Sequence, residues 1–83
     1  MSYFIRTMST AGLTVTAQRY QDRLSAGDMN SGQVYYMLQD MQKLLTEIDR
    51  RLTRAPKELA ASLAEIKKAH VETMTQARAI CWP

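Results

Sequence analysis

The feature that most constrains this sequence is a long apolar repeat within residues 31–54. Apolar residues recur there at steps of three and four, at Val34, Met37, Leu38, Met41, Leu44, Leu45, Ile48 and Leu52. This spacing places them on one face of an α-helix over roughly five turns. Polar and charged residues, Glu47 among them, fall on the opposite face. The sequence therefore predicts a long amphipathic helix that must pack against other helices.

Local signals predict where this helix begins and ends. Asn30 can cap the start, and Gln33 stands at the position that completes a capping box. At the other end, Pro56 disfavours helical conformation in Ala55 and suits the first turn of a new helix. We expect a helix over residues 31–54, then a very short turn into an antiparallel partner.

The predicted partner helix starts at Pro56 and reaches about Ile80. Its seam of alternating steps of four and three consists of Leu59, Leu63, Ile66, His70, Thr73, Ala77 and Ile80, with Ala60 and Met74 on its flank. The seam weakens after Ile66, because His70, Thr73 and Ala77 offer little apolar area. We expect the second half of this helix to stabilise the fold less, and to face either a partner or water.

A shorter helix is predicted from about Thr14 to Ala26, with Leu13, Ala17, Tyr20 and Leu24 on one stripe and Gly27 as its terminator. Residues 1–12 are expected to form a flexible arm, because Tyr3, Phe4 and Ile5 favour strands rather than helices. That arm is either loose or packed on the helices or a partner. The predicted fold is all-α: a long antiparallel helical hairpin plus one shorter N-terminal helix, with residues 13–83 forming a single helical domain.

The residues needed for catalysis or metal binding are scarce. The single histidine, His70, and the single cysteine, Cys81, lie about 16 Å apart along one predicted helix, beyond hydrogen-bond reach. One Cys and one His also cannot complete a zinc site. The acidic residues alternate with basic ones on predicted outward faces. We expect no enzyme activity, no metal and no cofactor. No signal peptide or membrane-spanning run is readable, so a cytoplasmic protein without a membrane partner is expected.

Aromatic residues and methionines suggest a protein interface. Residues 34–37, Val-Tyr-Tyr-Met, exceed what one helix face can bury. Tyr and Met are enriched at interfaces. The predicted interface comprises Tyr35, Tyr36, Met37, Met41, His70, Met74 and Trp82. Alternatives stay open: the tyrosines can instead pack on Tyr20, Trp82 can fold back on the hairpin, and His70 can be a partly wet seam residue or one that sets register or partner choice.

Basic residues cluster around the predicted turn, at Arg50, Arg51, Arg54 and Lys57. They either complement the dipole of the preceding helix, or contact an anion or an acidic partner. The net charge of +3 is mild for a nucleic-acid binder.

The predicted function is a non-enzymatic interaction module, an adaptor, chaperone-like partner or inhibitor, that also forms a homodimer. The alternatives are a small nucleic-acid-binding regulator that uses the basic turn, and a structural helical subunit of a larger assembly.

Overall fold

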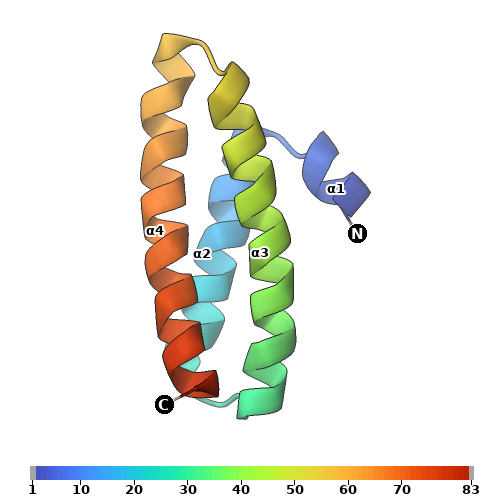
Figure 1. Cartoon of the computed structure of the whole chain (residues 1–83), viewed down its shortest axis with the longest axis vertical. Coiled ribbons are helices and arrows are strands. Elements are labelled where there is room, and N and C mark those ends of the chain that lie inside the picture. The colour runs from blue at the N-terminus through green and yellow to red at the C-terminus, as the bar shows by residue number, and fades with distance from the viewer. Residues whose placement is uncertain (1, 83) are drawn as a thin grey trace.

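The computed structural model describes residues 2–82, and the side chains of residues 5–82. The elements are α1 (Ser2–Thr7), α2 (Thr10–Ala26), α3 (Ser31–Arg54) and α4 (Lys57–Cys81), and no strand occurs within the described range. Helices α2, α3 and α4 run up and down beside one another as a bundle, and α1 stands off to the side of α3 (Figure 1). The predicted all-α class and the α3–α4 hairpin are confirmed.

Helix α3 begins and ends where the capping residues and the proline in the sequence predict. The Asn30 side chain accepts a hydrogen bond from the Gln33 amide at 2.9 Å, and the Gln33 side chain accepts one from the Asn30 amide at 3.0 Å. This capping box satisfies two donors that the first turn would otherwise leave unpaired. At the far end Ala55 is extended, with φ −70° and ψ 139°. Pro56 is extended too, so α4 begins one residue later than predicted, at Lys57.

The N-terminal region is more helical than the sequence suggested. Helix α2 begins at Thr10 because the Ser9 hydroxyl caps it, accepting from the Gly12 amide at 3.0 Å. The prediction of a start near Thr14 overlooked this cap. The range 1–12, expected to be an arm without helix, contains α1 as well as the first turn of α2. Tertiary contacts outweigh the weak helix propensity here, since Ile5 and Met8 pack against the bundle. The predicted roles of Tyr3 and Phe4 lie outside the described side chains.

The core consists of two apolar clusters stacked along the bundle. The cluster nearer the start of α3 contains Leu24, Val34, Met37, Leu38, Met41, Met74 and Ala77. The cluster nearer the α3–α4 turn contains Leu13, Ala17, Leu44, Ile48 and Leu63. Tyr20 packs against both and joins them. Each cluster draws on α2, α3 and α4, so α2 covers the third side of the hairpin.

The buried face of α4 differs from the predicted seam. Leu59 is 44% exposed and Ile80 is 43% exposed, whereas Met74, predicted on the flank, is 1% exposed. A straight helix drifts by about 20° per heptad relative to a strict seven-residue repeat, so one seam cannot stay buried along 25 residues. The buried residues of α4 are Leu63, His70, Thr73, Met74 and Ala77. The second half of this helix is therefore buried in the bundle, where a face turned to a partner or to water was expected.

Candidate protein-docking surface

Three aromatic side chains gather where α3 begins and α4 ends. Tyr35 and Tyr36 lie near the start of α3, and Trp82 follows the last residue of α4. The antiparallel hairpin brings these two helix ends to the same end of the bundle (Figure 1). The Tyr35 ring lies 5.9 Å from Tyr36 and 6.0 Å from Trp82, centroid to centroid, edge-to-face in both pairs. We call these three residues the aromatic surface.

The aromatic surface is open to solvent. Tyr35, Tyr36 and Trp82 expose 42%, 71% and 61% of their areas. Together with Ser31, Gly32 and Cys81 they line a shallow pocket of about 370 Å³. The small residues in the first turn of α3 leave this hollow unfilled, and the Cys81 thiol donates to the Ser31 carbonyl oxygen at 3.6 Å. The rings meet edge-to-face, a favourable arrangement for aromatic pairs, so this end of the bundle presents an exposed aromatic patch.

Two of the alternatives left open by the sequence are answered by these contacts. Tyr35 packs on Tyr36 and Trp82, while Tyr20 lies against His70, with ring centroids 6.0 Å apart. Trp82 folds back onto the hairpin through Tyr35 and still remains exposed. The packing of the tyrosines on Tyr20, considered from sequence, is not what the rings adopt.

The other four residues of the predicted interface lie inside the folded chain. Met37 is 8% exposed, Met41 0%, Met74 1% and His70 1%. The three methionines belong to the core cluster nearest the aromatic surface. A partner that docks on the chain as folded here does not reach these four side chains. The sequence has more apolar side chains than the hairpin alone could bury, and the prediction underestimated how many of them α2 covers.

His70 is a polar residue in the middle of the core. Its Nε2 lies 2.8 Å from the Met41 carbonyl oxygen on α3. Because a carbonyl can only accept, Nε2 carries the hydrogen, and Nδ1 of the neutral ring bears a lone pair. Nδ1 is buried and has no hydrogen-bond partner among the described residues. Burial lowers the pKa of His70 below its ordinary value, and the bond to the Met41 carbonyl opposes this in part.

The basic turn is partly neutralised from within the chain. Glu47, expected on the outer face, is 4% exposed and pairs with two of the predicted anion-contacting residues. Its carboxylate accepts from Arg50 at 2.7 and 3.0 Å and from Arg51 at 2.7 Å. The hydrogen bonds from Arg50, with further bonds from Arg51, hold the pKa of Glu47 below its usual value even though burial raises it. The spacing of Glu47 and Arg51 by four residues was the sequence signal for this pairing.

Arg51 also fastens α1 to the bundle. Its guanidinium donates to the backbone carbonyl oxygens of Ile5 at 3.2 Å, Arg6 at 3.3 Å and Met8. These carbonyls lie at the end of α1, where a helix leaves acceptors unpaired. Arg51 is thus occupied by the carboxylate and the carbonyls. Of the four basic residues, Arg54 and Lys57 are exposed.

Comparison with known proteins adds no relative: no family model, no curated protein and no solved structure matches the chain. None of the described helices combines the length and the apolar character needed to cross a membrane. Across residues 2–82, no three His, Cys, Asp or Glu side chains come together as a metal site would require.

Proposed function

We propose that this chain is a protein–protein interaction module that docks through the aromatic surface, first of all onto a second copy of itself. The observation that carries the proposal is the exposure of three aromatic rings around a pocket, with Tyr35 packed against the other two. Tyr and Trp dominate binding energies at interfaces, because they give large contact area at a low cost in side-chain entropy. An adaptor, chaperone-like partner or inhibitor would use the same surface.

The size of the aromatic surface sets the expected affinity. Three such rings, each burying about 150–250 Å² when fully covered, can bury on the order of 300 Å² from their observed exposure. A stable interface buries about 800 Å² per partner. The aromatic surface therefore supplies the centre of an interface, and polar neighbours would supply its rim. We therefore expect a transient association rather than a permanent dimer.

Sedimentation equilibrium at micromolar concentrations tests this proposal. The wild-type protein should give a mass above one chain, and Tyr36→Asp should return it to the monomer with an unchanged helical circular dichroism spectrum. Gln42→Asp is the matched control, because it adds the same charge to an exposed position of α3 outside the aromatic surface. A wild type that is monomeric throughout and captures no protein partner would refute the proposal. Equal weakening by both variants would show that charge, not the rings, governs association.

The nucleic-acid alternative is less well supported, since Arg50 and Arg51 are committed to Glu47 and to α1. No contact favours the structural-subunit alternative over the docking module.

A further inference from the structure

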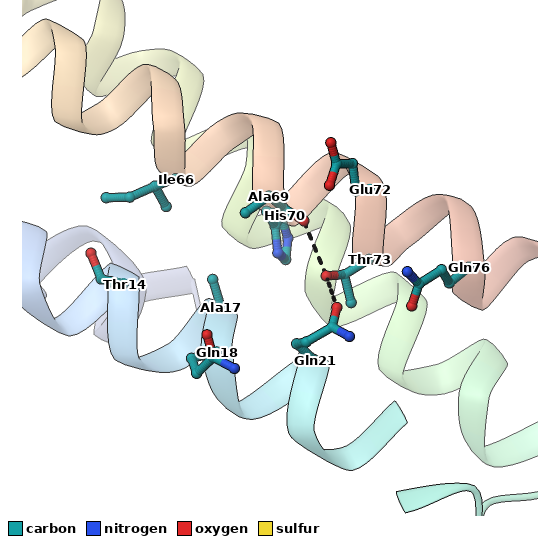
Figure 2. Close-up of a pocket in the computed structure, with 10 residues that line it drawn as sticks. All are labelled: Thr14, Ala17, Gln18, Gln21, Ile66, Ala69, His70, Glu72, Thr73 and Gln76. Carbon is teal, nitrogen blue, oxygen red and sulfur yellow. Dashed lines mark hydrogen bonds between the residues drawn. The ribbon is translucent and has the colours of Figure 1, made fainter. Parts of the chain in front are cut away.

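A second hollow lies between α2 and α4 and shares no residue with the aromatic surface (Figure 2). It encloses about 330 Å³. Ala17, Ile66 and Ala69 give it apolar walls, and the remaining lining residues are Thr14, Gln18, Gln21, His70, Glu72, Thr73 and Gln76. Ligand pockets commonly combine an apolar body with a few polar groups in this way.

The polar group at the floor of this pocket is His70. Its ring extends from α4 toward α2 (Figure 2), and the side chain is 1% exposed. Nε2 is used by the Met41 carbonyl, which leaves the Nδ1 lone pair buried with no partner. Nearly all buried polar atoms in proteins are paired, so an unpaired acceptor beside a hollow marks a place where a donor would bind favourably.

The neighbouring polar groups do not supply that donor. Thr73 and Gln21 bond to each other across the two helices, with Thr73 Oγ1 2.5 Å from Gln21 Oε1 (Figure 2). Thr73 Oγ1 also lies 3.0 Å from the Ala69 carbonyl oxygen. These contacts close one side of the pocket and occupy the hydroxyl nearest to His70 in sequence.

The lining also limits the charge of a ligand. Glu72 is the single charged side chain in it, so an anion would meet a carboxylate and a lone pair together. A cation would have to shed its hydration to reach a neutral imidazole, which is costly. A neutral O–H donor avoids both penalties. A cavity of about 150 Å³ already accepts benzene, so this pocket has room for a single ring that carries a hydroxyl group.

We propose that the pocket between α2 and α4 binds small neutral single-ring compounds that carry a hydroxyl, with the hydroxyl donating to His70 Nδ1. The ring rests against Ala17, Ile66 and Ala69. His70 lines the pocket and its Nδ1 is buried, so the hydroxyl reaches Nδ1 once lining side chains move aside. This site is independent of the aromatic surface, and its occupancy does not depend on self-association.

Nitrogen NMR of the imidazole reads this contact directly. His70 is the single histidine of the chain, so ¹⁵N-histidine labelling gives one pair of ring signals without assignment. Phenol and cyclohexanol are the probes, and benzene is the matched ring without a donor. Phenol should shift the Nδ1 resonance toward that of a hydrogen-bonded nitrogen, and Nε2 should stay nearly constant. Benzene should bind up to roughly tenfold more weakly, the usual value of one hydrogen bond, without the Nδ1 shift.

A pair of variants locates the site without altering His70. Ala69→Leu should fill the pocket and abolish the phenol-induced shift. Ala64→Leu, the same change at an exposed position of α4 outside the pocket lining, should leave the shift intact. An unmoved Nδ1 signal with both hydroxyl probes overturns the proposal. So does an equal shift with benzene, or a shift that survives in Ala69→Leu.

Discussion

Replacing Ile48 with alanine tests the assignment of the core most directly. Ile48 is fully buried in the cluster that joins α3 to Leu13 and Ala17 of α2 and Leu63 of α4. Removing a buried Ile side chain to Ala costs about 2–5 kcal/mol, because transfer free energy is lost and a cavity remains. Contacts from three helices limit collapse around the cavity, which places the expected cost in the upper half of that range.

The free energy of unfolding expected for a chain of this length is small. At about 0.05–0.15 kcal/mol per residue, 83 residues give roughly 4–12 kcal/mol in total. Ile48→Ala should therefore lower the urea midpoint by about 3 M or more, for a slope near the low end of about 1–3 kcal/mol per M. Far-UV circular dichroism during urea unfolding measures this. Leu45 is half-buried, so Leu45→Ala should lower the free energy of unfolding by less than Ile48→Ala does. Gln42 is exposed, so the free energy of unfolding of Gln42→Ala should stay within about 0.5 kcal/mol of the wild-type value. Equal losses at Ile48 and Gln42 would refute the core assignment.

Three further predictions concern the polar contacts. Arg51→Ala should speed amide exchange in residues 5–8 while α3 and α4 keep their protection, since Arg51 bonds the carbonyls at the end of α1; unchanged exchange would contradict that role. The protein should form no sequence-specific nucleic-acid complex at physiological salt in electrophoretic shifts, because Arg50 and Arg51 are occupied; a submicromolar complex that weakens steeply with salt would contradict this. The third is pH dependence: burial lowers the His70 pKa below 6.5 in the folded state, so the unfolded state binds more protons as the pH falls. The stability that the neutral, buried His70 contributes is therefore fully present above pH 6.5 and is lost as the pH falls below that value. Urea midpoints should fall between pH 7 and pH 5, and that part of the fall should vanish in His70→Gln.

The parts of the fold that the sequence predicts are those controlled by short-range signals. The α3 limits follow from Asn30, Gln33 and Pro56, which act within one turn of the helix ends. The N-terminal region depends on longer-range contacts. Ile5 lies in α1 and Met8 follows that helix, and both pack on the bundle. Arg51 bonds backbone carbonyls more than 40 residues away along the chain. No local pattern encodes such a contact.

A count of apolar residues could not tell which of the predicted interface residues are exposed. More apolar area than two helices can bury is offered by Val34, Tyr35, Tyr36 and Met37. Which of these side chains become buried depends on where α2 lies. The structure buries Val34 and Met37 and leaves the two tyrosines outside. The burial of Glu47 could not be predicted either, because it depends on the hydrogen bonds that its carboxylate accepts from Arg50 and Arg51.

The buried histidine ties these observations to the specificity of the fold. An α3–α4 contact built from Leu, Met and Ala alone would tolerate sliding, because apolar contacts are not directional. A shift of α4 along α3 by a fraction of a turn would carry His70 Nε2 out of hydrogen-bond reach of the Met41 carbonyl, which lies 2.8 Å away in this register. An unpaired buried donor costs about 1–3 kcal/mol, a large share of the stability of so small a protein. This geometry favours the interpretation of His70 as a residue that sets the register of the hairpin. The same register places Trp82 beside Tyr35 at the end of the bundle, so we expect a change of register to separate these two rings as well.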